Sequence, residues 1–146
     1  MKYTHSIVIN LPREKVIELF DNPDNMKHWQ PGLVSFENIS GTPGEAGTKS
    51  RLKYIMSKRE VEMIETITKR KLPDEFSGTY EAKGVWNEVK NYFNKISPRK
   101  TEWISECEFK FSGFMKIMSL VMPGAIKKES YKYLRLFKEF AESTSS

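Results

Sequence analysis

The feature that most constrains the fold is a change in the spacing of apolar residues near Ser112. Between Leu33 and Ser112, apolar and polar residues alternate with a period of two, which is typical of strands with one buried face. Turn-forming residues interrupt the alternation at the spacing of hairpins, at 41–47, 57–58, 72–74, 83–84 and 97–99. The pattern predicts six strands in an antiparallel meander.

The N-terminal segment adds one more strand and two short helices. Residues 3–10 alternate and are rich in β-forming side chains, so they are expected to form the first strand. Pro12 then stands at the entry of a helix over residues 13–20. A second short helix is expected to end near Trp29.

After Gly113 the period becomes helical and continues to about Glu142. A kink or break is expected at Pro123-Gly124, and residues 143–146 are expected to form a frayed tail. The part after the break is strongly amphipathic. Its predicted inner face consists of Ile126, Ser130, Tyr133, Phe137 and Phe140.

Composition excludes several classes of protein. A chain of 146 residues with 24 basic and 19 acidic residues suits one domain over residues 1–146 with a mild net charge of +5. Its many aromatic and Met residues argue against disorder, and no apolar run reaches the length of a membrane span, so no integral membrane association is expected. The basic residues are interleaved with acidic ones and accompany no nucleic-acid motif, so no nucleic acid is expected as a partner.

Motifs for metals and cofactors are missing from the sequence. The two histidines, His5 and His28, show no metal-ligand spacing, and the glycine-rich segment 41–47 lacks the Lys-Ser/Thr ending of a phosphate loop. We therefore expect no metal and no cofactor. The single cysteine, Cys107, cannot form an internal disulfide, which favours the cytoplasm. Oligomeric state is left open.

Alternation assigns one face of each strand to the interior. Across the turn at 57–58, Lys53 is expected to lie beside Glu62 on the outer face. The link into the last strand needs an odd loop or a bulge to keep the register. The inward face is mostly apolar, but it also carries Ser50, Glu65, Gly78, Tyr80, Asn87, Asn91, Ser105 and Cys107. Unpartnered buried polar groups cost about 1 to 3 kcal/mol each, so this face predicts water or a ligand between sheet and helix.

Short motifs accompany this order of elements: Ile9-Asn10-Leu11-Pro12 with Val16 and Phe20, Asn22-Pro23, Trp29-Gln30-Pro31-Gly32, Gly47-Thr48, Glu65-Thr66-Ile67 and Gly113. Together with the order of elements, they resemble the helix-grip fold of the START-related superfamily, also called SRPBCC, which includes polyketide cyclase/dehydrase proteins. The resemblance covers nearly the whole chain. It implies an α+β fold with a seven-stranded curved antiparallel sheet around a long C-terminal helix, and a cavity for a lipid, sterol, polyketide or similar hydrophobic molecule. It carries over no catalytic motif.

The candidate ligand-binding residues are those assigned to the inward face of the sheet and helix. Glu65 is also the candidate catalytic residue, because burial raises a carboxyl pKa and suits a general base or a polar anchor. The alternatives are that Glu65 pairs with a basic neighbour or faces solvent. The full set is Leu52, Tyr54, Met63, Glu65, Phe76, Gly78, Tyr80, Asn87, Val89, Asn91, Trp103, Ser105, Cys107, Phe109, Met122, Ile126, Tyr133 and Phe137.

Three classes of function remain open at this level. The leading hypothesis is a binding protein for a small hydrophobic molecule. The second is an enzyme of cyclase, dehydratase or hydrolase type, and the third is a protein-interaction module with a filled interior. Whether the protein is an enzyme is undecided. If Gly78 faces the cavity, Gly78→Leu is expected to reduce ligand uptake more than stability.

Overall fold

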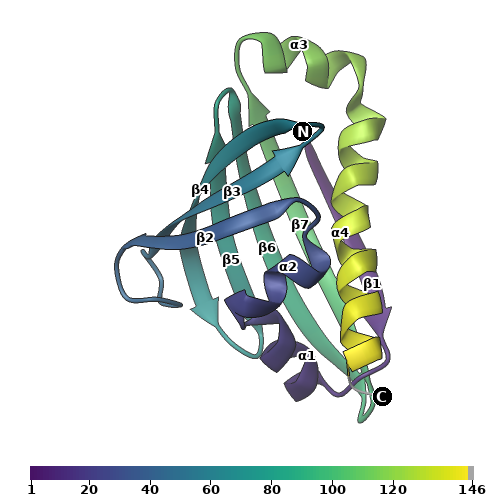
Figure 1. The fold of residues 1–146 in the computed structure, drawn as a ribbon. Helices are drawn as coiled ribbons and strands as arrows, with labels where there is room; N and C mark the ends of the chain where they lie inside the picture. Colours follow the sequence, from purple (N-terminus) through teal and green to yellow (C-terminus); the bar gives the residue numbers. More distant parts are fainter. Residues whose placement is uncertain (145–146) are drawn as a thin grey trace.

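Seven antiparallel strands form one curved sheet in the computed structural model, which describes residues 1–144 (Figure 1). The order in the sheet is β1-β7-β6-β5-β4-β3-β2. This confirms the predicted meander and first strand. Residues 145 and 146 of the predicted domain and tail lie outside the described residues. The strands are β1 (Lys2–Ile9), β2 (Leu33–Ser40), β3 (Lys49–Met56), β4 (Arg59–Lys71), β5 (Glu75–Ala82), β6 (Val85–Ser97) and β7 (Lys100–Phe111).

Helices occur in the two predicted places. After β1 come α1 (Arg13–Phe20), the short 3₁₀ helix η1 (Pro23–Asn25) and α2 (Met26–Trp29). After β7 come α3 (Phe114–Val121) and α4 (Pro123–Thr144). The Asn22 side chain caps η1 by accepting a hydrogen bond from the Asp24 amide at 3.0 Å.

The break between α3 and α4 falls at Met122, one residue before the predicted site, because Pro123 starts the new helix. The expected fraying is wrong for Ser143 and Thr144. Both lie in α4, where their hydroxyls donate to the Phe140 carbonyl at 2.9 Å.

The strand registers confirm the predicted faces. Phe76, Gly78 and Tyr80 lie opposite Asn91, Val89 and Asn87, as expected. The bulge needed before the last strand lies between Lys95 and Ser97. Lys53 and Glu62 are register partners, but their ion pairs are staggered, with Arg51 on Glu62 at 2.8 Å and Lys53 on Glu60 at 3.9 Å.

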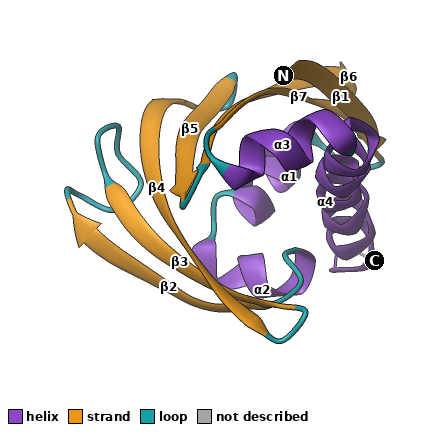
Figure 2. Ribbon diagram, turned by 90° about the horizontal axis from the view of Figure 1, so that it is seen from above, coloured by secondary structure: helices purple, strands orange, loops and turns teal. Residues whose placement is uncertain are grey.

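The strands β1 and β2 follow each other in the chain but lie at opposite edges of the sheet. Residues 10–32, which connect them, therefore cross the concave side, where α1 and α2 lie within the curve of the sheet (Figure 2). This segment, called the strap below, contacts β6 and β7 through α1 and β2 through α2, at one end of the concave face.

The helix α4 lies along β1, at one side of the grip (Figures 1 and 2). Polar contacts hold it there: the Lys138 ammonium donates to the Val8 carbonyl at 2.6 Å, and the Asn10 amide donates to the Glu142 carboxylate at 3.0 Å. The buried residues of α4 are Leu134, Phe137 and Ala141. The predicted inner face is thus confirmed for Phe137, while Ile126, Ser130, Tyr133 and Phe140 are only partly buried beside it.

An aromatic cluster fills the space where the strap meets α4. The Phe20 ring lies 5.1 Å from Phe93 and 5.4 Å from Trp103, centroid to centroid. Phe137 lies 5.2 Å from Trp29 and 5.3 Å from Trp103. Most of these contacts are edge-to-face, the geometry that aromatic quadrupoles favour. This end of the grip is therefore packed solid.

Candidate functional site

A cavity of about 110 Å³ lies between the strap and the sheet. Its walls come from α1, η1 and α2 on one side and from β2, β3, β4, β5 and the 41–47 loop on the other. The lining residues are mostly apolar, with few charged groups. They are Phe20, Asp21, Pro23, Met26, Trp29, Gln30, Phe36, Asn38, Pro43, Gly44, Thr48, Ser50, Glu65, Ile67, Arg70, Phe76 and Tyr80.

Strand pairing brings the polar residues of the floor into one row. Ser50 on β3 is the register partner of Glu65 on β4, which in turn is the partner of Tyr80 on β5. Residues directly opposite each other on one face lie within contact range. The period-two pattern that turns these side chains inward therefore also places them side by side.

Glu65 is the buried acid of this row, with an exposed fraction of 7%. Burial raises the pKa of its carboxyl, and a hydrogen bond with the Tyr80 phenol acts in the opposite direction. No basic group forms an ion pair with Glu65 among residues 1–144. The carboxyl is thus buried as expected, and the alternatives of a salt-bridged or solvent-facing Glu65 are wrong.

Burial near Glu65 also raises the pKa values of two tyrosines, Tyr80 and Tyr54. Burial, followed by the charge of Glu65, raises the pKa of Tyr80 well above its ordinary value. Burial also raises the pKa of Tyr54, with smaller effects from Tyr133 and Glu65. The Tyr54 hydroxyl donates to the side-chain oxygen of Gln30 on the strap. Both phenols remain neutral hydrogen-bonding groups over the physiological pH range.

At the rim, an ion pair joins the sheet to the strap. The Arg70 guanidinium on β4 donates both of its terminal nitrogens to the Asp21 carboxylate, one of them at 2.7 Å. Arg70 also lies against Gly44 in the 41–47 loop. Such two-pronged pairs hold a fixed geometry. The pair therefore links three parts of the cavity wall.

Trp29 lines the cavity, and its indole N–H donor has no hydrogen-bond partner. Its indole Nε1 has no contact with solvent, and in the described part of the chain it is the single side-chain nitrogen or oxygen so enclosed that has no hydrogen-bond partner. Native proteins satisfy nearly all buried donors, so an exception in a cavity wall calls for an explanation. A ligand acceptor is one explanation.

Three of the predicted ligand-binding residues line the cavity: Glu65, Phe76 and Tyr80. Leu52, Tyr54 and Met63 pack with Met26 in a small cluster next to it. The reason is the position of α4: it lies along β1, and the cavity is lined by residues of the strap and by none of α4.

The remaining predicted residues lie away from this cavity. Trp103 and Phe137 belong to the solid aromatic cluster, and the Trp103 indole donates to Asn91 at 2.9 Å. Asn87 donates to the Glu108 carbonyl at 3.1 Å, Phe109 stacks on Phe111, and Val89 lies opposite Cys107. Ser105 and Cys107 contact each other at 3.6 Å, while Ile126 and Tyr133 are partly buried on α4 and Met122 is 49% exposed. Ligand contacts by these residues stay a prediction.

Gly78 does not face open space. A Cβ at this position would lie 3.0 Å from the Thr66 carbonyl oxygen on β4. Gly78 is not among the residues that line the cavity, and a side chain there would require the Thr66 backbone to shift slightly. The expectation that Gly78→Leu reduces ligand uptake more than stability stays a prediction.

Sequence reasoning missed the strap side of the site. The pattern places Phe20 and Trp29 on short helices and Gln30 in a turn, and it gives no sign of contact with the inward polar row. Apolar residues on both short helices were the available signal, since two short amphipathic helices must bury their faces against the only open concave surface. The histidines serve structure: the His5 Nε2 lies 3.1 Å from the Lys127 carbonyl oxygen, and His28 stacks on Phe140.

Residues 1–142 match the family model described as "Polyketide cyclase / dehydrase and lipid transport". The chain belongs to this family. The resemblance to the START-related superfamily is thereby confirmed. The family's description agrees with the expected classes of function, which are binding of a hydrophobic molecule or cyclase chemistry.

Solved structures of the same fold cover nearly the whole chain. A conserved protein from Geobacillus kaustophilus is 16% identical with a TM-score of 0.84, over 99% of this chain and 97% of that one. The Zhui aromatase/cyclase from Streptomyces sp. R1128 is 11% identical with a TM-score of 0.80, over 100% and 96%. A START superfamily protein from Mycobacterium smegmatis is 9% identical with a TM-score of 0.78, over 98% of each chain. At these identities the likeness shows the helix-grip fold. No curated protein matches the chain in sequence.

Proposed function

We propose that the protein binds a small hydrophobic molecule with one polar group, held in the cavity between the strap and the sheet. The observation that carries the proposal is the buried Glu65 carboxyl, which lies in a mostly apolar cavity without an ion-pair partner in the described chain. A few convergent polar groups in an apolar wall are the usual form of a small-molecule site. The unpartnered Trp29 indole and the neutral Tyr80 phenol add hydrogen-bonding capacity to the same wall.

The size of the cavity limits what it accepts in this conformation. Typical ligand pockets measure about 300 to 1,000 Å³, whereas an apolar cavity of about 150 Å³ can hold benzene. At about 110 Å³, the cavity is somewhat smaller than that, so one ring is the upper limit of what it accepts in this conformation. A larger lipid or polyketide requires the strap to move away from the sheet, which would break the Arg70–Asp21 pair at the rim.

Phenol is a suitable probe for this site, with benzene as its apolar counterpart. We expect phenol to bind more tightly than benzene in ligand-observed NMR, because the Glu65 carboxyl can accept a hydrogen bond from its hydroxyl. In Glu65→Leu the preference for phenol should disappear, whereas Glu62→Leu, on the outer face of the same strand, should retain it. Absence of binding by both probes, or an unchanged preference in Glu65→Leu, would refute the proposal.

Dehydration of a β-hydroxyketone is the second candidate function, and the raised pKa of Glu65 favours it. An ionised Glu65 can accept the proton from the carbon next to the carbonyl. It can then return that proton to the departing hydroxyl, which leaves as water. The test uses 4-hydroxy-4-phenylbutan-2-one and follows the absorbance of the conjugated enone. Product formation that is lost in Glu65→Gln supports catalysis, and a rate equal to that of buffer alone rejects it for this substrate class.

The interaction-module hypothesis required a filled interior, and the cavity argues against it. A cytoplasmic location stays a proposal that rests on the free, buried Cys107.

A further inference from the structure

The helix α3 exposes an apolar surface at one end of the molecule. None of its residues is buried, although six of the eight are large and apolar. Phe114 is 71% exposed, Leu120 76% and Val121 70%. Exposed apolar groups gathered on one element mark an interaction site more often than scattered ones do. The helix therefore needs an account of what covers it.

The position of α3 is fixed by the sheet. It follows β7 directly and lies against the β5–β6 turn, where a Cβ at Gly84 would meet the Met115 side chain at 3.1 Å. The apolar side chains are thus held away from the interior of the grip. At the top of Figure 1, α3 forms the outermost element at that end.

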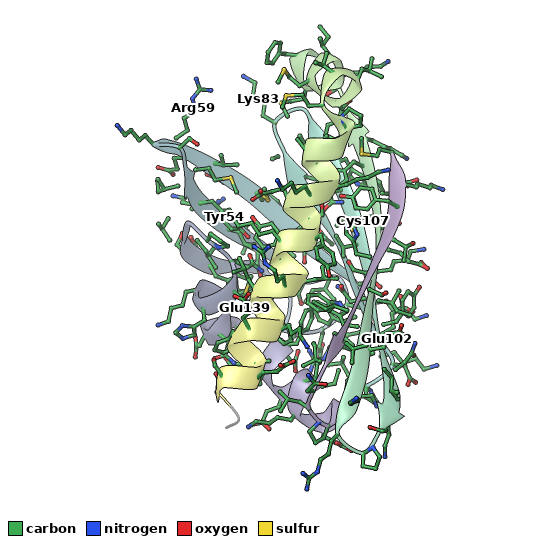
Figure 3. All side chains as sticks on the ribbon, turned by 90° about the vertical axis from the view of Figure 1, so that its right-hand side faces the viewer. Tyr54, Arg59, Lys83, Glu102, Cys107 and Glu139 are labelled. Carbon is green, nitrogen blue, oxygen red and sulfur yellow. The ribbon has the colours of Figure 1, made fainter. Side chains whose placement is uncertain are left out.

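Several exposed basic residues lie at the same end of the molecule as α3. Arg59, the first residue of β4, and Lys83 on the β5–β6 turn lie at the same end of the molecule as α3 (Figure 3). Exposed basic residues of this end include Lys58, Arg59, Lys83, Lys116, Lys127 and Lys128, and exposed acidic residues include Glu60, Glu81 and Glu129. Within residues 1–144 none of the six basic side chains forms an ion pair, whereas Glu60 is paired with Lys53. The end carries a surplus of free positive charge.

We propose that α3 and these basic residues dock the protein onto an anionic membrane surface. An apolar face flanked by Lys and Arg is the arrangement by which short helices bind in the interface of a bilayer. At about 1.5 Å per residue, α3 is roughly 12 Å long and cannot cross a hydrocarbon core of about 30 Å. In agreement, no helix of the described residues is long and apolar enough to span a membrane.

The positive charge at the α3 end favours an anionic membrane over a second copy of the chain as the partner. In a two-fold dimer the same surface meets itself, so the two basic rims would repel each other. An anionic lipid surface has the opposite sign and attracts each of them. The apolar residues of α3 can enter the lipid headgroup region while the lysines contact the lipid phosphates and carboxylates.

The test is co-sedimentation of the full chain with vesicles of phosphatidylcholine containing 30% phosphatidylserine, as a fraction chosen to be roughly that of an anionic leaflet. We expect binding to these vesicles, weaker binding at high salt, and little binding to pure phosphatidylcholine. Each basic residue near an anionic surface contributes about fivefold in affinity. Lys83→Glu/Lys116→Glu is therefore expected to weaken binding at least about 25-fold, and Ile117→Ser/Leu120→Ser at least about tenfold.

Matched controls lie at the opposite end and on the opposite edge of the sheet. Lys95→Glu/Lys100→Glu changes two exposed lysines next to the β6–β7 turn, and Val34→Ser changes an exposed apolar residue on β2. Both controls should bind vesicles as the parent chain does. No sedimentation of the parent chain, or equal loss in controls and α3 variants, overturns the proposal. Dimerisation that Ile117→Ser/Leu120→Ser abolishes, without vesicle binding, would assign the surface to a second copy and also overturn it.

Discussion

Filling the cavity from the sheet side should strengthen the fold and abolish ligand binding together. Ser50 lines the cavity, is 3% exposed and makes no side-chain hydrogen bond within residues 1–144. A residual cavity costs about 24 cal/mol per Å³, so 110 Å³ corresponds to about 2.6 kcal/mol. Ser50→Leu fills part of this volume and loses no bond. We expect the free energy of unfolding to rise by about 1 to 2 kcal/mol, or Tm by about 2 to 8 °C.

The assay combines urea unfolding with phenol binding by NMR, on Ser50→Leu and on Ser35→Leu. Ser35 is exposed on β2, so the same chemical change there adds apolar surface without entering the cavity. Ser35→Leu should leave phenol binding unchanged, whereas Ser50→Leu should weaken it more than tenfold. A destabilised Ser50→Leu variant that still binds phenol would refute the reasoning, because the leucine would then have met protein atoms instead of open volume.

Three further predictions concern stability. Because the pKa of Glu65 is raised, the folded state binds the carboxyl proton more tightly than the unfolded chain does. This contribution to the free energy of unfolding is present below about pH 4.5 and is lost as pH rises through the folded pKa. The loss is about 1.4 kcal/mol for each pH unit between the unfolded and the folded pKa. In urea titrations Glu65→Gln should therefore gain more over the parent chain at pH 7.5 than at pH 4; an equal difference at both values contradicts the assignment. Gly78→Ala should lower Tm because its Cβ presses on the Thr66 carbonyl, and an unchanged Tm would show that the strands can separate there. Phe137→Ala, at a fully buried position in the aromatic cluster, should cost about 3 to 5 kcal/mol, while Tyr131→Ala, partly exposed on the same helix, should cost much less; similar losses would disprove the special weight of the cluster.

Most features of the sheet could be predicted from local patterns in the sequence. The period of two decided which side chains turn inward, and turn lengths decided which residues face each other, so that Glu65 was expected on the inner face and is buried there. The bulge between Lys95 and Ser97 was required by the same register argument. These features depend on neighbours along the chain or across one turn.

The place of the cavity depends on contacts that no local pattern encodes. Helical periodicity places Phe137 on the inner face of the C-terminal helix. It does not show that this helix, α4, lies along β1 instead of across the middle of the sheet. That choice accompanies the packing of Phe20 and Trp29 on the strap against Trp103 on β7 and Phe137 on α4, which are far from them in sequence. The exposure of the apolar side chains of α3 could not be predicted for the same reason. A helix with these side chains has the same sequence pattern whether or not another element covers it.

The strap has a consequence for the size of molecule the grip can admit. Since residues 10–32 connect the two outermost strands, their contour length limits how far the sheet edges can spread. Insertions in this connection would widen the opening and deletions would narrow it, with every wall residue left intact. Ligand size would then be tuned by chain length in one segment, separately from the chemistry of Glu65 and Tyr80.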